Sequence, residues 1–247
     1  MSSAVAIISD IHGNVWALES VLNDIRKRNI DCIVNLGDSL YGPLEPCSTA
    51  KILMNEKIIS ISGNQDRIIL ESIGKTNIHQ TMSYVINNLD AQSMEWIKSL
   101  SSTCVLQDNI FLCHGTPEDD DKYLLENITQ NNISLRPEIE LIKCLTKINQ
   151  QIILCGHSHI SRTVYLSSGK MIINPGSVGL QAYEDDIPYN HAMESGSPHA
   201  RYSILTPIDN DLEVENIALP YCYDKAAECA LKRNRHDWQR ALLLGRV

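Results

Sequence analysis

The 247-residue sequence has no long hydrophobic run and no excess of basic residues. No stretch approaches the ~20 consecutive apolar residues that a membrane-spanning helix requires. Lys and Arg number 21 against 30 Asp and Glu, and the formal net charge of −9 argues against long nucleic acids and anionic membrane surfaces as partners. The N-terminus has no basic segment and reaches Asp10 too early for a secretory signal peptide. Small substrates remain open, as does a locally positive site within an acidic protein.

Signals for disulfides and for disorder are also weak. The eight cysteines include no C-x-x-C pair, and Cys32, Cys113 and Cys155 lie in apolar runs, where a free cysteine behaves as a small buried hydrophobic residue. We therefore expect a reducing, cytoplasmic location. With 43% hydrophobic residues and few Gly and Pro, the composition is typical of a folded globular protein. No repeat or linker divides the chain, so we predict a single domain over residues 1–247.

The first half of the sequence alternates apolar strands with helical segments. Strands are predicted at Ala4–Ser9, Asp31–Leu36 and Lys57–Ile61, and the alternation indicates a mainly parallel sheet that is buried on both faces. After a further strand at Ile152–Cys155, short strands follow one another without a long helix, which favours a second, mostly antiparallel sheet. The strands in question are Thr163–Leu166, Met171–Asn174, Tyr202–Thr206 and Leu212–Leu219. A final helix is expected over Tyr223–Leu244, and the stretch 192–198 is expected to be a polar loop.

Polar residues of the metal-ligand type follow five of the predicted strands. In open α/β sheets, ligands bind beyond the carboxyl ends of the strands, so we expect these segments to converge in one pocket. The side chains are Asp10, His12, Asp38, Asn64, His114, His157 and His159. This mixed oxygen and nitrogen set, with no thiolate, suits Mn²⁺, Fe, Ni or Zn²⁺. It exceeds the needs of one catalytic ion but fits two ions if one carboxylate bridges them.

The order of these segments resembles that of the calcineurin-like metallophosphoesterases. The matching motifs are D-x-H at 10–12, G-D at 37–38, G-N at 63–64, H-G at 114–115 and G-H-x-H at 156–159. The element Asn174-Pro175-Gly176-Ser177 is similar to the N-P-G-S element of the small bacterial phosphodiesterases of this superfamily. The resemblance implies an α/β fold, a four-layer αββα sandwich of two mixed β-sheets flanked by helices.

The resemblance also implies a division of the ligands between two divalent metal ions, with Mn²⁺ expected and Fe, Ni or Zn as alternatives. The first ion would take Asp10, His12 and His159, the second would take Asn64, His114 and His157, and both would share Asp38. A hydroxide between the metals would attack phosphorus, and the cations would neutralise charge on the phosphoryl oxygens. Asn64 would contact both metal and phosphate. The implied activity is hydrolysis of a phosphodiester or nucleotide-type phosphoester.

One position departs from the pattern of the family. Many members carry a histidine after the metal-binding asparagine, where it protonates the leaving group, but this chain has Gln65. A glutamine amide cannot act as a general acid at neutral pH. Either another group such as Asp66 supplies the proton, or the leaving group has a low pKa and needs none. A dinucleoside polyphosphate or an activated aryl ester would satisfy the second condition.

Four residues are candidates for substrate binding. The backbone amides of Gly13 and Asn14, at the start of the first predicted helix, form a candidate anion site. Gln65 and Arg67 follow the metal-binding asparagine closely enough to contact the substrate. The alternative for Asp66 and Arg67 is a structural role at a helix N-terminus.

Other classes of function remain as alternatives. A non-catalytic scaffold of the same fold is one, although such a protein would be expected to have lost ligands, and all are present here. A protein phosphatase shares the chemistry, while a nuclease would need a basic groove that the sequence does not show. Trp238, in a charged terminal helix, is expected either to pack on the sheet or to form part of a homodimer contact.

Overall fold

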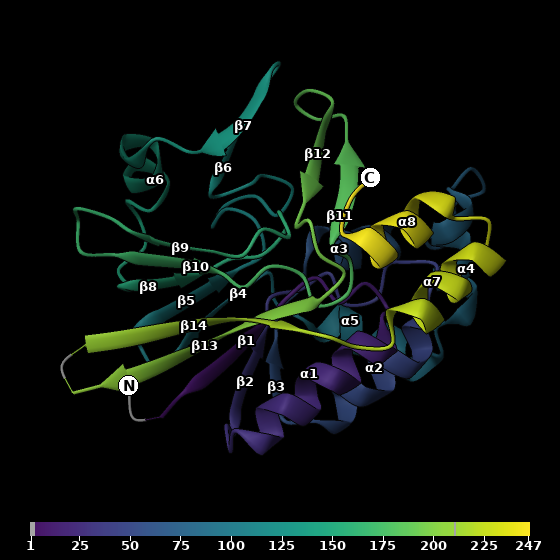
Figure 1. Ribbon diagram of the computed structural model, residues 1–247, viewed down its shortest axis with the longest axis horizontal. Helices are drawn as coiled ribbons and strands as arrows, with labels where there is room; N and C mark the ends of the chain where they lie inside the picture. The colour runs from purple at the N-terminus through teal and green to yellow at the C-terminus, as the bar shows by residue number, and fades with distance from the viewer. Residues whose placement is uncertain (1–2, 210) are drawn as a thin grey trace.

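Two five-stranded β-sheets packed face to face form the centre of the computed structural model, which describes residues 3–209 and 211–247 (Figure 1). The first sheet has the order β14-β13-β1-β2-β3, and the second has the order β4-β5-β8-β10-β9. The first consists of β1 (Val5–Ile8), β2 (Cys32–Asn35), β3 (Ile58–Ser60), β13 (Ala200–Ile208) and β14 (Asp211–Leu219). The second consists of β4 (Thr103–Leu106), β5 (Ile110–Cys113), β8 (Ile152–Leu154), β9 (Arg162–Tyr165) and β10 (Met171–Asn174). Residues 1, 2 and 210 of the expected domain lie outside the described residues.

Strand β1 shows why the sheets stack. Val5 and Ile7 belong to the hydrophobic cluster between the sheets, together with Leu112 of the second sheet. Ala6 and Ile8 belong to the cluster beneath the helices. Because successive side chains of a strand alternate between its faces, this wholly apolar run is buried on both sides. Burial of each large apolar side chain stabilises the fold by ~2 kcal/mol.

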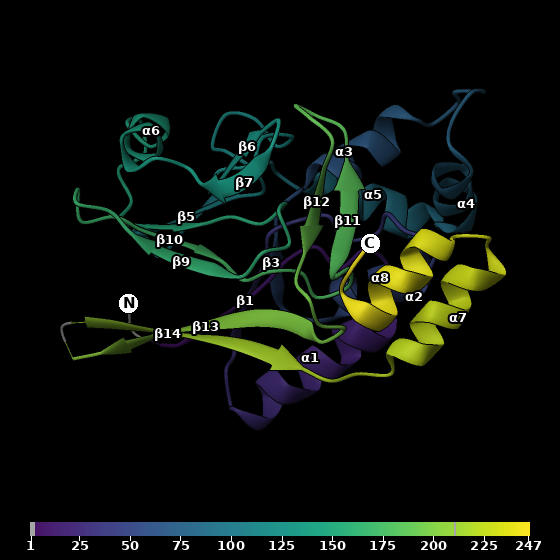
Figure 2. The same ribbon diagram turned by 45° about the horizontal axis from the view of Figure 1, so that its top comes forward.

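Helices cover the outer faces of both sheets and complete four layers (Figures 1 and 2). Those that share the core of the first sheet are α1 (Val15–Lys27), α2 (Pro46–Asn55), α3 (Asn64–Glu71), α4 (Gln80–Asn88), α5 (Ala91–Ser99), α7 (Tyr223–Lys232) and α8 (His236–Leu244). Helix α6 (Glu138–Cys144) lies on the second sheet, where Leu141 packs with Phe111 and Ile153. This arrangement confirms the predicted αββα sandwich.

The parallel strands bring the predicted ligand segments to one edge of the molecule. Strands β1, β2 and β3 are parallel neighbours, and so are β5, β8 and β10. Their carboxyl ends therefore point the same way within each sheet. Asp10 follows β1, Asp38 follows β2, Asn64 follows β3, His114 follows β5, and His157 and His159 follow β8.

The prediction of a mostly antiparallel second sheet was wrong in two respects. That sheet is mixed, because β8 pairs in parallel with both β5 and β10. The strands predicted at 202–206 and 212–219 belong instead to the first sheet, as the long hairpin β13–β14 that pairs with β1. Apolar alternation along a strand reveals which residues are buried but not which sheet edge the strand joins.

The last part of the chain also differs from the prediction. The expected helix over 223–244 is divided into α7 and α8 at Asn234, whose φ of 59° is left-handed and ends a helix. The stretch predicted as a loop begins inside β12 (His191–Glu194), which pairs with β11 (Ala182–Asp185) in a separate hairpin. A second small hairpin joins β6 (Glu126–Thr129) to β7 (Asn132–Leu135).

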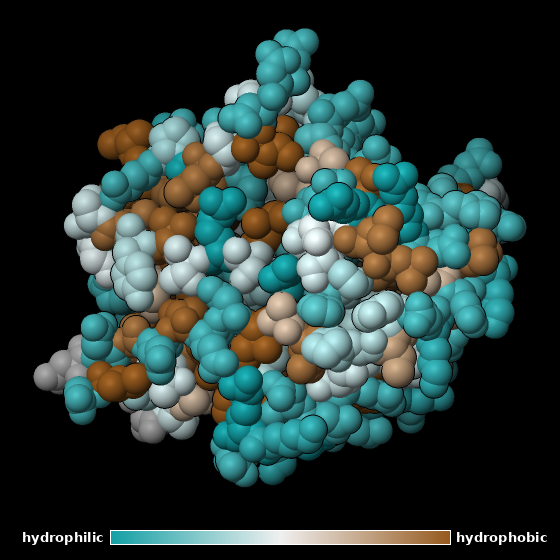
Figure 3. Space-filling view, in the orientation of Figure 1, coloured by the Kyte–Doolittle hydropathy of each residue, from teal (hydrophilic) through white to brown (hydrophobic). Residues whose placement is uncertain are grey.

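The face of the molecule seen in Figure 3 is mostly polar. Figure 3 shows a face on which hydrophilic residues predominate and hydrophobic ones form small separate patches. Among the described residues, no helix combines the length and the apolar character needed to cross a lipid bilayer. All eight cysteines lie within these residues and are free thiols.

Candidate metal centre

Most of the predicted ligands adopt a backbone conformation that side chains rarely take. Five of them have left-handed φ values, namely Asp10 (54°), His12 (53°), Asp38 (54°), His157 (69°) and His159 (61°). For a non-glycine residue this conformation costs on the order of 1 kcal/mol or more, and it persists only where the surrounding structure enforces it. Each loop therefore turns sharply after its strand and directs its ligand into a shared centre.

The first cluster consists of Asp10, His12 and His159. One ligand atom from each of them lies within 4.8 Å of the others, and all three residues are buried. His12 Nδ1 lies 2.9 Å from the carbonyl oxygen of Tyr41, and His159 Nδ1 lies 2.7 Å from that of Leu180. A carbonyl oxygen only accepts hydrogen bonds, so each Nδ1 carries the proton and each Nε2 presents a lone pair.

The donor atoms of this first cluster fit a cation. His12 Nε2 and His159 Nε2 face each other at 3.1 Å, and burial together with the neighbouring His159 lowers the pKa of His12 to about 4. With His12 neutral, two lone pairs point at the same space and repel each other unless a positive charge stands between them. The buried Asp10 Oδ1 has no hydrogen-bond partner among the described residues and lies 3.3 Å from His159 Nε2. The Nε2 atoms of the two histidines thus face the space that a metal would occupy, while their Nδ1 atoms donate hydrogen bonds that fix the orientation of each ring, as is usual for metal-binding histidines.

The second cluster consists of Asp38, His114 and His157, with Asn64 beside it. One ligand atom from each of the first three lies within 4.8 Å of the others. His114 Nδ1 donates to the Leu36 carbonyl oxygen at 2.8 Å, and its Nε2 lies 3.4 Å from Asp38 Oδ2 and 3.1 Å from Asn64 Oδ1. His157 is turned the other way, because its Nε2 donates to the Asp121 carbonyl oxygen at 3.1 Å and leaves Nδ1 for a metal.

Electrostatics at His114 also demand a positive charge. Burial disfavours the charged imidazole, but the carboxylates of Asp38 and Asp10 outweigh burial and raise the pKa of His114 to about 10. Asp10 Oδ1 lies 3.9 Å from His114 Nε2, so the two clusters adjoin. A proton or a metal cation can supply the charge that these buried carboxylates require.

Two glycines allow the ligand loops to approach one another. A Cβ atom on Gly63 would overlap Asp38 Oδ1, and one on Gly156 would overlap the side chains of Ser9 and Asp10. No larger residue fits at either position. Gly63 of the G-N motif therefore allows two loops of the first sheet to pack closely, and Gly156 of the G-H-x-H motif allows a loop of the second sheet to pack against a loop of the first.

The N-P-G-S element ties the loops of both sheets together. Ser177 Oγ donates to the Asp10 carbonyl oxygen at 2.7 Å, and Asn174 Nδ2 donates to the Gly156 carbonyl oxygen at 2.7 Å. Asn14 Nδ2 donates to the Gly179 carbonyl oxygen at 2.9 Å. These bonds hold the loop after β1 against the loop after β8. Asp10 and His12, which follow β1, therefore keep a fixed distance from His159, which follows β8.

A pair of tyrosines supports the histidines of both clusters from outside. Tyr183, on β11, has its ring 4.6 Å from that of His159, and its hydroxyl lies 2.9 Å from the His157 carbonyl oxygen and 3.0 Å from the Tyr123 hydroxyl. The ring of Tyr123 stacks on His157 at 4.7 Å, and its hydroxyl lies 3.1 Å from Nε2 of His191 on β12. The β11–β12 hairpin is thus connected to both metal clusters. No motif in the sequence marks these tyrosines.

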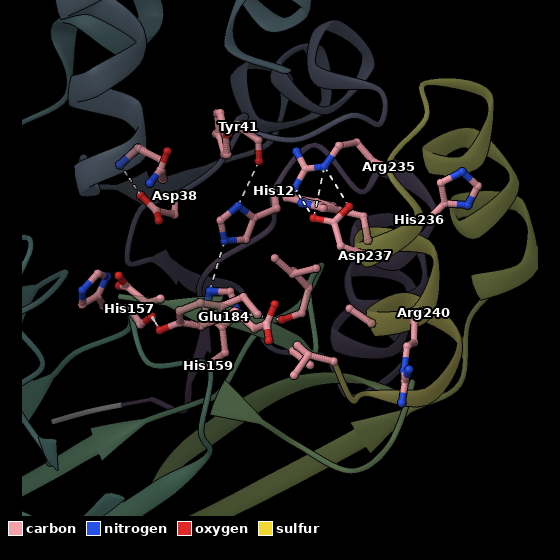
Figure 4. Close-up of a pocket in the computed structure, with 18 of the residues that line it drawn as sticks. His12, Asp38, Tyr41, His157, His159, Glu184, Arg235, His236, Asp237 and Arg240 are labelled. Carbon is pink, nitrogen blue, oxygen red and sulfur yellow. Dashed lines mark hydrogen bonds and ion pairs between the residues drawn. The ribbon is translucent and has the colours of Figure 1, made fainter. Parts of the chain in front are cut away.

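A cavity of about 720 Å³ opens onto the two clusters. His12, Asp38, Asn64, His157 and His159 line its inner end, and strand β11 of the β11–β12 hairpin and helix α8 line most of the rest (Figure 4). Trp238 is only 6% exposed, and its ring lies edge-on 5.8 Å from that of His12. Trp238 therefore packs within the site rather than on a sheet or on a free surface.

Of the four candidate substrate-binding residues, one lines the cavity and the other three are hydrogen-bonded within the protein. Gln65 lines the cavity, and its backbone N–H donates to Asp38 Oδ1 at 2.8 Å. The N–H groups of Gly13 and Asn14 are engaged within the protein, since they donate to the carbonyl oxygens of Ser39 and Ile11. The guanidinium of Arg67 does not line this cavity and is bound by three carboxylates. These belong to Glu71, Asp120 and Asp121.

Asp66 is fully buried behind the cavity. Its carboxylate accepts the backbone N–H of Gly63 and that of Ser39, each at 3.1 Å, so it joins the loops after β2 and β3. Burial and the nearby charge of Asp38 raise the pKa of Asp66 to about 7. Asp66 therefore holds the loop that presents Asp38, and its carboxylate does not reach the cavity.

The fold and the paired clusters are those of a metallophosphoesterase. The sequence model of the calcineurin-like phosphoesterase superfamily domain matches residues 4–192, and the chain belongs to this superfamily, as its motifs predict. Superfamily membership implies phosphohydrolase activity and two metal ions. The chain is 26% identical over 270 residues to protein MJ0912 of Methanocaldococcus jannaschii, a match that covers 100% of both chains. Its structure is similar to that of a metallophosphoesterase from Sphaerobacter thermophilus, with a TM-score of 0.76, 22% identity and coverage of 99% of this chain and 100% of that one.

Proposed function

We propose that the protein is a phosphoesterase that uses two divalent metals, Mn²⁺ being the expected ion, to hydrolyse a small phosphodiester or nucleotide-type phosphoester. Asp10, His12 and His159 hold one metal, Asn64, His114 and His157 hold the other, and Asp38 is shared. The observation that carries the proposal is the pair of facing imidazole lone pairs beside an unpartnered buried carboxylate oxygen. The chain retains every ligand of the family pattern, which favours an enzyme over a scaffold.

The metals, when bound, supply Lewis-acid charge that neutralises the phosphoryl oxygens and lowers the pKa of a nucleophilic water. The residues of the chain do the rest. Asn64 presents a neutral amide, so it can contact the phosphate without repelling it. Gln65 lies in the cavity where a general acid would be useful, but it has no proton to give at neutral pH. The enzyme is therefore suited to substrates whose leaving group is stable as an anion.

The shape and charge of the molecule favour a small substrate. The cavity is walled by α8 and by the β11–β12 hairpin, and the net charge is −9. A long nucleic acid would need an extended basic groove. We further propose that residues 1–247 act as one unit, because helix α8, near the end of the chain, helps to line a pocket that His12, near its start, also lines. The free thiols of the eight cysteines support the proposal of a reducing, cytoplasmic location.

The test is a hydrolysis panel in the presence of Mn²⁺. We expect turnover of bis(p-nitrophenyl) phosphate and of a dinucleoside tetraphosphate, and little turnover of an alkyl monoester. The Asp38→Asn variant should lose on the order of 10³-fold in kcat while keeping its melting temperature without metal, since it removes the shared negative ligand. Unchanged activity of Asp38→Asn would refute the shared role. Bound metal with no turnover of any substrate would favour the scaffold.

A further inference from the structure

Part of the outer wall of the cavity lies outside the part of the chain that matches the superfamily. The match ends at residue 192, whereas Arg235, Asp237, Trp238 and Ala241 line the cavity from the start of α8 and from within it. In Figures 1 and 2, α8 stands beside β11. The candidate metal ligands therefore all lie in the shared domain, whereas the outer wall is built partly by β11 of that domain and partly by the segment that follows it.

Arg235 is a cation of this outer wall that hydrogen bonds hold in place. Its Nε donates to Asp237 at 2.9 Å and its Nη2 donates to the same carboxylate at 2.5 Å, while its Nη1 donates to Thr81 Oγ1 at 2.6 Å. Its side chain is 21% exposed, and the guanidinium carbon lies 5.5 Å from the centre of the Trp238 ring. A guanidinium carries five N–H donors, so these contacts fix its plane and leave N–H groups for a further acceptor.

The end of the Arg235 guanidinium that Asp237 does not occupy is directed toward Tyr41, whose hydroxyl is close enough to interact with it, and toward the metal centre. Figure 4 shows Arg235 and Asp237 pointing from α8 toward Tyr41 and His12, whereas Arg240 points away from them. The centre of the Trp238 ring lies 5.5 Å from the guanidinium carbon of Arg235 and 5.8 Å from the centre of the His12 ring. Arg235 and His12 thus contact the same aromatic ring, and a ligand held beside His12 can extend to Arg235 along the cavity that both residues line.

Other charges on the wall restrict where a second anion can bind. Glu184 and Asp185 of β11 also line the cavity, and their carboxylates would repel an anion on the hairpin side. Asp237 neutralises part of the charge of Arg235, but it occupies the Nε side of the guanidinium only. Bidentate binding of a carboxylate on one side and a phosphate on the other is within the donor capacity of arginine.

We propose that Arg235 binds the phosphoryl group next to the scissile one, so that the substrate class is phosphoanhydrides, such as nucleoside or dinucleoside polyphosphates, rather than simple diesters. This inference rests on the proposed function. In the reaction, the oxygen of water bonds to the scissile phosphorus and the bond to the bridging oxygen breaks. The electron pair stays on that oxygen, which leaves as part of a phosphate, and the protons of water pass to the solvent.

The proposal explains how the site works without a general acid. The pKa of a phosphate leaving group is low enough that it departs as an anion, and Arg235 stabilises the charge that develops on it. Gln65 and Arg235 line the same cavity, and each independently favours this class of leaving group. An alkyl diester would receive neither a proton from residue 65 nor any benefit from Arg235.

The test compares Arg235→Gln with Arg246→Gln, an exposed arginine that does not line the cavity. With Mn²⁺ present, Arg235→Gln should lose about 10- to 100-fold in kcat/KM on a dinucleoside tetraphosphate and less than about threefold on bis(p-nitrophenyl) phosphate. Arg235→Lys should retain part of the wild-type kcat/KM on the dinucleoside tetraphosphate, and Arg246→Gln should match the wild type on both substrates. By calorimetry, imidodiphosphate should bind the wild type about tenfold more tightly than phosphate does, and Arg235→Gln should abolish that preference.

Two results would overturn the proposal. Equal losses on both substrates would mean that Arg235 only supports His12 through Trp238, and unchanged kinetics with an unchanged preference for imidodiphosphate would mean that it binds no phosphate. Wild-type turnover of the diester without any preference for the polyphosphate would refute the inference while leaving the proposed function intact. Failure of the metal-loaded wild type on both substrates would instead refute the proposed function. Melting curves of each variant show whether it is folded.

Discussion

The inner end and the outer wall of the cavity are built in opposite ways. At the inner end, each candidate ligand follows a strand within a few residues, and left-handed backbone directs five of the seven to the centre. The outer wall is made by α8 and the β11–β12 hairpin, whose side chains carry no motif and meet only through packing. The inner end holds buried carboxylates and imidazoles that require a cation, while the outer wall mixes Arg235 with Glu184, Asp185 and Asp237.

The inner end and the outer wall therefore serve different tasks, namely the binding of cations and the choice of substrate. Buried carboxylates and lone pairs have no stable arrangement without positive charge, so the inner end is suited to holding cations. The outer wall carries charges of both signs with an excess of carboxylates, so substitutions of its exposed residues should change what the cavity accepts more than they change the fold. Metal chemistry and substrate choice can therefore vary independently in this protein.

Removal of metal should have the largest effect and should act on the inner end alone. Chelation with EDTA is expected to reduce hydrolysis by at least about 10³-fold, and Mn²⁺ should restore it. Metal at 100 times its Kd should stabilise the fold by about 2.7 kcal/mol. Calorimetric melting with and without Mn²⁺ measures this increment. An Arg235→Gln protein should show the same increment, and a smaller one would mean that the wall and the metal centre are coupled.

Tyr183→Phe tests whether the hairpin belongs to the inner end. The variant removes the hydroxyl that lies 2.9 Å from the His157 carbonyl oxygen and 3.0 Å from the Tyr123 hydroxyl. We expect metal affinity to fall by about 10- to 100-fold with little change in kcat at saturating metal, because the support of a ligand is lost and not the ligand itself. Titration calorimetry with Mn²⁺ measures the affinity. Tyr189→Phe, at a tyrosine that is 49% exposed on the hairpin, is the matched control.

Gln65→His should alter the balance between substrates. A histidine at this position would add a proton donor to the cavity, so turnover of esters with poor leaving groups should rise by about tenfold. Esters with good leaving groups should gain less. A series of aryl phosphodiesters of graded leaving-group pKa measures the slope of log kcat, and an equal gain across the series would contradict the interpretation of Gln65.

Asp237→Asn should have the smallest effect and should depend on pH. Partial burial would raise the pKa of Asp237, but hydrogen bonds and charge from Arg235 lower it below its usual value of 3.8. A lowered carboxyl pKa contributes stability that is present above pH ~4 and is lost as pH falls through the folded value. The side chain is 58% exposed, so the contribution is at most about 0.5 kcal/mol. Melting of both proteins at pH 7 and pH 3 should show the small difference disappear at the lower pH, and a difference that grew on acidification would contradict the assigned sign.

The convergence of the candidate ligands and the layers of the fold could be predicted because their signals are local. Asp10, Asp38 and His114 each follow an apolar run of strand length, and the carboxyl ends of parallel strands share an edge. The position of β13–β14 could not be predicted, since its alternation fits either sheet. Asn234 is the residue whose left-handed φ separates α7 from α8, and the sequence alone left it inside one predicted helix.

The sequence by itself determined the residue types of the metal centre, their placement after strands and the absence of a histidine at position 65. Those features depend on neighbours within a few residues. Only the tertiary structure decided which nitrogen of each imidazole faces the metals, because distant carbonyl oxygens such as those of Tyr41 and Leu180 set that choice. It also decided that Arg235 and Trp238 wall the cavity, because helix packing brings residues more than 200 positions apart in sequence into contact with His12 and its surroundings.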